Sequence, residues 1–178
     1  MTVTRFPLIA GCAVFAACGN DVVGERATPA ICRAPAVITA TSAGAPALFT
    51  LEDSAQLTSG QEHYLGSVRA NPASAEVHLA RLAPDAAALL QPGDTVLLTV
   101  SPTRSFSAIG SRVTPSGSWE GRIENEFGSA LLVLHEGDLT GTLQSVPNGG
   151  PISTFAFRPL GGGMHALVCL DASKFPPD

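Results

Sequence analysis

Residues 118–145 decide the fold of this chain, and they read SWEGRIENEFGSALLVLHEGDLTGTLQS. Apolar and polar side chains alternate along much of this stretch, and Glu136-Gly137-Asp138 interrupts the alternation. A period of two residues is typical of a β-strand with one face in a core, and a short break that contains glycine is typical of a hairpin. The stretch therefore predicts neighbouring antiparallel strands.

The same pattern continues on both sides of this stretch. Turn-forming residues such as Ser116-Gly117, Phe127-Gly128, Asn148-Gly149-Gly150 and Gly161-Gly162-Gly163 separate nearly all of the runs. Short strands joined by tight turns predict an all-β domain, an antiparallel meander that forms a small barrel or sandwich. The expected strands are Thr95–Ser101, Ser105–Val113, Trp119–Glu126, Ser129–His135, Leu139–Ser145, Ser153–Pro159 and Met164–Asp171.

The region before Thr95 is less regular. Pro84–Gln91 is the only segment that predicts a helix, because proline suits the first turn and a run of Ala and Leu follows it. Ala47–Leu51 predicts a short strand, Thr58-Ser59-Gly60 a turn, and Glu76–Leu82 an alternating strand. The fold class is thus all-β with one short helix.

Residues 1–17 have the features of an export signal. Arg5 is the only charged residue before Cys18, and Phe6–Ala17 is an uninterrupted run of apolar and small residues. The run fits the hydrophobic region of a signal segment and is too short to span a bilayer. Phe15-Ala16-Ala17-Cys18 resembles a bacterial lipobox, which predicts a lipid on Cys18 and a membrane-anchored lipoprotein.

Three alternatives to a lipid on Cys18 stay open. Ile9-Ala10-Gly11-Cys12 has a better lipobox composition, but it leaves only about five apolar residues before the cysteine. A simple secretory signal cleaved after Ala17 would leave the chain without a lipid, and a core helix would keep the segment in the fold. Both signal interpretations place the protein outside the cytoplasm. Gly19 after Cys18, by resemblance to lipoprotein sorting, indicates the outer membrane and a periplasm-facing protein.

The sequence divides into a signal segment at 1–17, an Ala/Pro-rich tether at 18–46 and a β domain at 47–178. Two cysteines besides Cys18 remain after the signal, Cys32 and Cys169. An even number of cysteines in an exported chain favours a disulfide between them. The alternative is a thiolate at Cys169 that serves as a metal ligand, for instance on the zinc of a partner.

The composition excludes several classes of function. The chain has 10 Lys and Arg against 15 Asp and Glu, a net charge of −5. Binding to nucleic acid needs a basic surface, so no nucleic acid is expected as a partner. With 45 % hydrophobic residues the chain has enough apolar surface to form a core, so disorder is not expected as its dominant state.

The sequence contains no recognisable catalytic motif. The histidines at 63, 78, 135 and 165 have no pair at the spacing of a zinc-binding helix, and no G-x-S-x-G nucleophile turn occurs. Glu124 and Glu126 are expected on one strand face beside solvent, where a charged outer face explains them better than acid–base catalysis. We therefore expect a protein that is not an enzyme, with no catalytic residue, metal or cofactor.

Trp119 is the only tryptophan of the chain. The alternation places Trp119, Gly121 and Ile123 on one strand face and Glu120 and Arg122 on the other. An apolar face with a large aromatic ring predicts that Trp119 anchors the core. The competing interpretation makes Trp119 an exposed anchor for a partner, because tryptophan is enriched at binding hot spots.

Several stretches of the C-terminal half, taken in order, are similar to a known family. They are Leu89–Asp94 (LLQPGD), Ser118–Arg122 (SWEGR), Leu131–Leu143, Phe157–His165 and Asp171–Asp178. Together, from about Pro84 to Asp178, they resemble the prosegment-like N-terminal region of secreted bacterial zinc metallopeptidases of the reprolysin type. In that family a catalytic domain with a zinc-binding histidine helix follows this region.

The chain ends at Asp178 without that helix motif, so the resemblance implies an accessory module and carries over no peptidase activity. It also implies a protein partner, a separate zinc metallopeptidase that the module inhibits or helps to fold, for example by strand addition. A second hypothesis is a structural or adaptor lipoprotein of the cell envelope without a peptidase partner. A third is a small enzyme or ligand carrier with a pocket at the barrel mouth.

Overall fold

A computed structural model describes residues 44–147 and 150–175. The predicted signal segment, Cys18 and Cys32 lie outside the described residues. The strands are β1 (Phe49–Leu51), β2 (Ser74–Leu82), β3 (Thr95–Ser101), β4 (Arg104–Val113), β5 (Ser118–Ile123), β6 (Phe127–His135), β7 (Asp138–Val146), β8 (Ser153–Gly161) and β9 (Met164–Leu170). The helices are α1 (Ser59–Ala70), α2 (Ala86–Leu89) and the 3-10 helix η1 (Ala172–Lys174).

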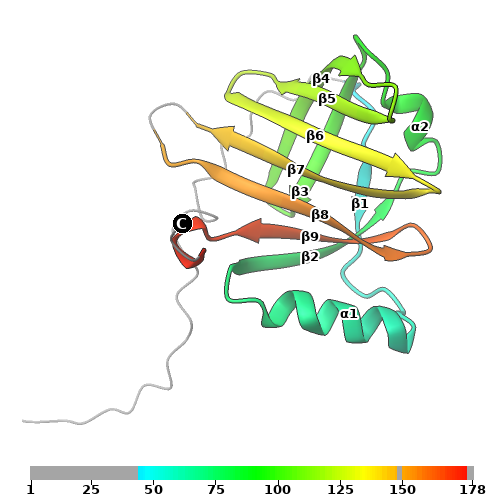
Figure 1. Cartoon of the computed structure of the whole chain (residues 1–178), viewed down its shortest axis with the longest axis vertical. Helices are drawn as coiled ribbons and strands as arrows, with labels where there is room; N and C mark the ends of the chain where they lie inside the picture. Colours follow the sequence, from blue (N-terminus) through cyan, green and yellow to red (C-terminus); the bar gives the residue numbers. More distant parts are fainter. Residues whose placement is uncertain (1–43, 148–149, 176–178) are drawn as a thin grey trace, which may run out of the picture.

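The nine strands form one sheet in the order β1-β2-β9-β8-β7-β6-β5-β4-β3, and all the paired strands are antiparallel. The sheet curves into a nearly closed barrel (Figure 1). The residues just before β1 meet β3 through an isolated parallel bridge between Ala47 and Leu97, where the N–H of Leu48 donates to the carbonyl of Leu97 at 2.9 Å. The predicted antiparallel meander and its expected strands are confirmed, with small shifts at the strand ends.

Alternation along the strands fills the barrel with side chains. In β5, Trp119 and Ile123 are each 1 % exposed and Gly121 is buried between them, whereas Arg122 is exposed. The exposed-anchor interpretation of Trp119 is therefore wrong. All nine strands contribute to one apolar cluster inside the barrel. Because antiparallel strands can bury one face and leave the other in water, this single interior accounts for the period of two in the sequence.

The indole of Trp119 explains the glycine two residues later. A Cβ atom on Gly121 would collide with the six-membered ring of Trp119. The ring of Trp119, from the same strand, occupies the space that a side chain at position 121 would need. The Nε1 of Trp119 lies 3.5 Å from the carbonyl oxygen of Gln91, so the polar atom of the ring also has a partner.

The helix α1 was not predicted. Thr58-Ser59-Gly60, expected as a turn, instead begins this 12-residue helix. Thr58 and Gln61 form a capping box, with Thr58 N–H donating to Gln61 Oε1 at 2.9 Å and Gln61 N–H donating to Thr58 Oγ1 at 3.4 Å. Leu65 of the helix packs on the outer face of β9 in a second apolar cluster. The helix carries few apolar residues and two glycines, so its periodicity in the sequence is weak.

The helix α2 marks one end of the barrel. The helix expected at Pro84–Gln91 is present but limited to Ala86–Leu89. Ala86 and Leu90 belong to the barrel core. The turns β4–β5, β6–β7 and β8–β9 lie at this same end, which we call the closed end.

One predicted turn is confirmed and another is displaced. Glu136 and Gly137 have φ values of 50° and 83°, positive at both central positions as a type I′ hairpin requires. Phe127-Gly128 was expected to turn, but both residues lie inside β6. The chain instead reverses before β6 begins, at Asn125, which has a φ of 61°. Asparagine tolerates this left-handed conformation better than most residues, which explains the position of the turn.

The opposite end of the barrel, which we call the open end, is polar. Arg104 Nη1 donates to Ser153 Oγ at 3.1 Å, and the hydroxyl of Ser145 donates to the carboxylate of Glu126. Burial lowers the pKa of Arg104, and the nearby charge of Glu126 opposes this effect. The connections β3–β4, β5–β6 and β7–β8 and the helix η1 lie at this end (Figure 1).

Candidate binding surface

The sequence singled out several residues, and the structure places only some of them. Trp119 and Cys169 lie inside the barrel, 1 % and 3 % exposed. Cys18 and Cys32 lie outside the described residues, so the lipid on Cys18 and the Cys32–Cys169 disulfide stay predictions. Glu124 and Glu126 do not share a strand face, because β5 ends at Ile123 and both carboxylates belong to the turn that follows.

His165 is enclosed at the closed end. Its Nε2 accepts a hydrogen bond from the N–H of Leu139 at 2.9 Å, and its Nδ1 lies 3.1 Å from the carbonyl of Gly163. This arrangement requires a neutral ring with its proton on Nδ1. Burial lowers the pKa of His165, and the hydrogen bonds and Asp138 only partly oppose that effect. Both ring nitrogens are engaged, so this histidine serves the fold.

Among residues 44–147 and 150–175, no group of three or more His, Cys, Asp or Glu could hold a metal ion. Within the same residues no helix is long and apolar enough to cross a membrane.

A recess runs over the outer side of β4, β5 and β6. One hollow of about 500 Å³ is lined by Arg122, Asn125, Glu126, Phe127 and Gly128. A second hollow of about 350 Å³ shares Arg122 and Gly128 with the first and is also lined by Ser111, Glu120, Gly121, Ser129, Ala130 and Leu131. Both are open to solvent, and together they form a shallow channel that we call the outer groove.

Large apolar side chains lie along one side of the outer groove. Phe127 is 77 % exposed and Leu131 is 47 % exposed, and both point outward from β6. Phe127 pairs with Val146 of β7, and Ile152, which is 59 % exposed, lies just before β8. Single exposed apolar residues are common on protein surfaces, but Phe127 and Leu131 line two hollows that share residues, and this grouping indicates an interaction site.

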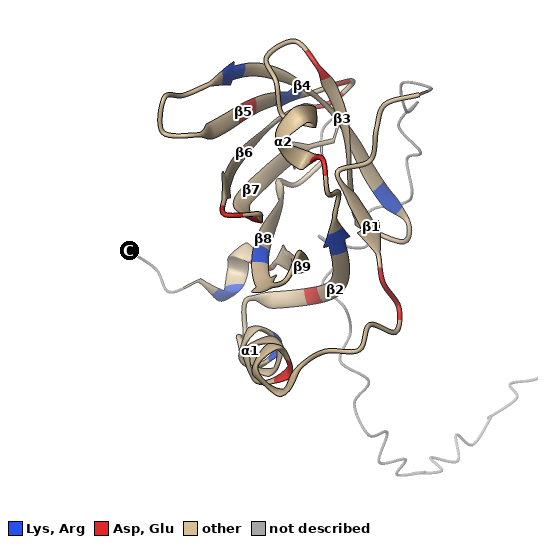
Figure 2. Cartoon of the chain, turned by 90° about the vertical axis from the view of Figure 1, so that its right-hand side faces the viewer, with Lys and Arg blue, Asp and Glu red and all other residues tan. Residues whose placement is uncertain are grey.

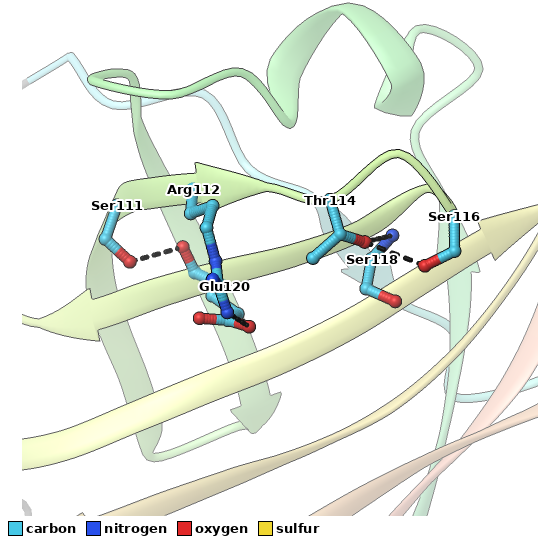
Figure 3. A network of polar contacts seen from close by, with 6 residues as sticks. All are labelled: Ser111, Arg112, Thr114, Ser116, Ser118 and Glu120. Carbon is cyan, nitrogen blue, oxygen red and sulfur yellow. Dashed lines mark hydrogen bonds and ion pairs between the residues drawn. The ribbon is translucent and has the colours of Figure 1, made fainter.

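Two polar residues that line the second hollow, Ser111 and Glu120, belong to a hydrogen-bonded network on β4 and β5 (Figure 3). Arg112 Nη2 donates to Glu120 Oε1, and this bond raises the pKa of Arg112. Ser111 Oγ donates to the carbonyl of Glu120 at 2.9 Å, so two residues of β4 hold this part of β5. Thr114 Oγ1 accepts from the N–H of Ser118 at 3.1 Å and fixes the hairpin turn. This network is therefore a structured part of the surface.

Arg122 lies where the two hollows meet. It points outward from β5 beside Glu120 and is exposed. No ion pair to its guanidinium occurs among the residues that the structure describes. Charged residues are sparse over the barrel as a whole (Figure 2). The outer groove therefore combines the apolar side chains of β6 with the positive charge of Arg122.

Phe127 was not among the residues expected at a site, because Phe127-Gly128 was interpreted as a turn. The informative signal was Asn125 between two glutamates, since asparagine is favoured where the chain needs a positive φ. Moving the turn to Asn125 places Phe127 at the start of β6 and on its outer face. Leu131 follows at an even spacing along the same strand, which puts both side chains on one face.

Comparisons with protein-family models, with curated proteins and with solved structures each found no match.

Proposed function

We propose that this protein is a non-catalytic, exported binding module that docks a protein partner on the outer groove. The observation that carries the proposal is Phe127, an aromatic side chain that is 77 % exposed and lines the larger hollow. Exposed aromatic and arginine side chains beside a pocket are the residues that most often contribute binding energy. Phe127 and Arg122 offer both types within one groove.

The chemistry of the outer groove defines the partner segment. An apolar side chain of the partner would pack against Phe127 and Leu131, and a carboxylate would pair with Arg122. Such a pair, exposed at the rim, contributes mainly to orientation and association rate, while the buried apolar contact contributes most of the affinity. The shallow shape suits a segment of a protein better than an enclosed small molecule.

A separate zinc metallopeptidase is the first partner to test, which the module would inhibit or help to fold. This part of the proposal is supported by the resemblance of Leu89–Asp94, Ser118–Arg122 and the later stretches to a metallopeptidase prosegment region. The alternative proposal is an adaptor lipoprotein of the cell envelope that uses the same groove without a peptidase partner. Recovery of a zinc peptidase from the envelope fraction favours the first, and recovery of other envelope proteins favours the second.

The test compares two variants of the full-length protein, Phe127→Ser and Tyr64→Ser. Tyr64 is a matched control because it is 44 % exposed but lies on α1, away from the groove. We expect Phe127→Ser to weaken capture of the partner at least about tenfold, as hot-spot truncations do, and Tyr64→Ser to leave it unchanged. Equal capture by both variants would show that the outer groove is not the docking surface.

Export and anchoring are tested separately on Cys18. We expect the mature protein to carry a lipid on Cys18 and to partition with membranes, and Cys18→Ser to accumulate as an unprocessed precursor. Intact mass measurement of the exported protein distinguishes the outcomes. A mature chain that begins at Cys18 without a lipid would reject the lipoprotein proposal and keep only secretion.

A further inference from the structure

Three apolar side chains form a row across the outer face of the barrel at its open end. Phe127 of β6 pairs with Val146 of β7 in the sheet register. Ser145 pairs with Ser153 of β8, so the next position along β7 lies beside Ile152, which directly precedes β8. The two serines are buried, and side chains alternate along a strand, so the residues next to them face outward. The row spans about 10 Å, because neighbouring strands lie about 4.8 Å apart.

Leu131 extends this apolar surface along β6. Phe127 and Leu131 are four positions apart and both exposed, which separates them by about 13 Å on one strand face. Between them, the small side chain of Ser129 lines the second hollow. Arg122 of β5 pairs with Ser129, so its positive charge flanks the middle of the surface on the side away from Ile152.

A partner segment cannot join this surface by strand addition. The strands β5, β6 and β7 each have a paired strand on both sides, so their backbone groups already take part in the sheet. Strand addition needs an exposed sheet edge. A segment that binds here must therefore use its side chains and satisfy its backbone hydrogen bonds internally. An α-helix does this along its whole length.

The same barrel holds a helix on another part of its outer face. The helix α1 lies along β2 and β9 (Figure 1), and its Leu65 and Val68 belong to an apolar cluster with Ala156 of β8. Gln61 Nε2 donates to the carbonyl of Gly161 at 2.8 Å. These three helix residues, at positions i, i+4 and i+7, mark the face of α1 that meets the barrel. The outer face therefore accepts a helix where apolar side chains surround a small residue.

We propose that the outer groove receives an amphipathic α-helix of the partner protein, laid along β6. The apolar stripe of this helix packs on Phe127 and Leu131, and an acidic residue on its flank pairs with Arg122. A helix with its side chains is about 10–12 Å wide, which matches the apolar row of about 10 Å, whereas a single strand covers only about 5 Å. The inference rests on the proposed function, because it names the kind of segment that binds at the same site.

Site-specific cross-linking in the full-length protein tests the conformation of the bound segment. The photoreactive residue p-benzoylphenylalanine replaces Phe127 in one variant and Leu131 in another, and mass spectrometry locates each cross-link in the partner. A helix rises about 1.5 Å per residue, so we expect the two cross-links about seven to nine positions apart. An extended segment would place them about four positions apart. That spacing would overturn the inference and leave docking at the outer groove intact.

A failure of the proposed function gives a different result. Absence of a cross-link from both positions would overturn docking at the groove and the helix together. The same photoreactive residue in place of Tyr64, which is exposed on α1, is the control and should give no link to the partner segment. Equal cross-linking from position 64 would likewise overturn both.

A substitution in the floor of the groove tests the fit of the helix independently. Ser129→Trp fills the hollow between Phe127 and Leu131 and should weaken capture of the cross-linked partner at least about tenfold. Thr50→Trp, at an exposed position of β1, is the matched control and should leave capture unchanged. Both positions are exposed, so equal urea midpoints are expected for the two variants. Unchanged or stronger capture by Ser129→Trp would overturn the inference.

Discussion

At the closed end of the barrel, Trp119 and His165 are enclosed by apolar side chains and their ring nitrogens have partners in the backbone. At the open end, Arg104 and Ser145 are held by side-chain hydrogen bonds to Ser153 and Glu126. The closed end is thus stabilised by filled volume and the open end by polar pairing. Filled volume is costly to remove from a core, whereas a single hydrogen bond contributes only about 0.5–1.5 kcal/mol to the net stability.

The strongest way to test this comparison is to remove the largest side chain of the closed end. Trp119→Ala should lower the free energy of unfolding by about 3–5 kcal/mol, through lost burial and the cavity it leaves. Glu120→Ala, the next residue but on the outer face, should change it by about 1 kcal/mol or less, because it removes only a surface ion pair. Urea melts of both variants provide the measurement. An unchanged midpoint for Trp119→Ala would contradict the strand register described for β5.

A smaller change tests how tightly the closed end is filled. Gly121→Ala adds one methyl group where the ring of Trp119 already lies, and should cost about 1–3 kcal/mol through overpacking. Gly66→Ala in α1 is the matched control, since a Cβ there meets nothing within 4 Å. It should stabilise the protein by about 0.5–1 kcal/mol, because alanine is the better helix former. Effects of the same sign in thermal melts would contradict this account of Gly121.

The pH dependence of stability tests the enclosed imidazole. Burial lowers the pKa of His165 in the folded state, so the unfolded chain binds a proton more readily. Stability should be constant above a pH of about 6.5 and fall below it, by up to ~1.4 kcal/mol for each pH unit. His165→Gln should remove this part of the slope, and His135→Gln should keep it because His135 is exposed. Slopes that match in the two variants would exclude His165 as the cause.

The smallest effect is expected at the open end. Arg104 lies over the rings of Phe106 and Phe155, with 4.9 and 5.2 Å from its Cζ to the two centroids. Arg104→Ala should cost about 1 kcal/mol by loss of these contacts and of the bond to Ser153. Arg122→Ala on the outer face should change stability by only about 0.5 kcal/mol. A cost for Arg104→Ala as large as that of Trp119→Ala would remove the distinction between the two ends.

The sequence by itself determined the meander. From Thr95 onward a period of two and well-placed turn residues predicted the strands, because the interior of a barrel imposes that alternation on each strand separately. The order of neighbours followed as well, since short connections join consecutive antiparallel strands. The turn at Asn125 could also have been predicted from its residue type. Phe127-Gly128, two residues later, is a second turn-forming pair and was preferred.

Only the tertiary structure decided the helix α1, the closure of the barrel and the outer groove. The helix is stabilised by its contact with the outer face of β9 and by a capping box, and its own apolar pattern is too sparse to predict it. Closure depends on a single bridge between Ala47 and Leu97, 50 positions apart, for which no local pattern exists. The groove arises because β4, β5 and β6 bring Ser111, Arg122 and Phe127 onto one curved surface. A local sequence pattern fixes which face a residue takes within its own strand, but pairing in three dimensions fixes which residues of other strands it meets.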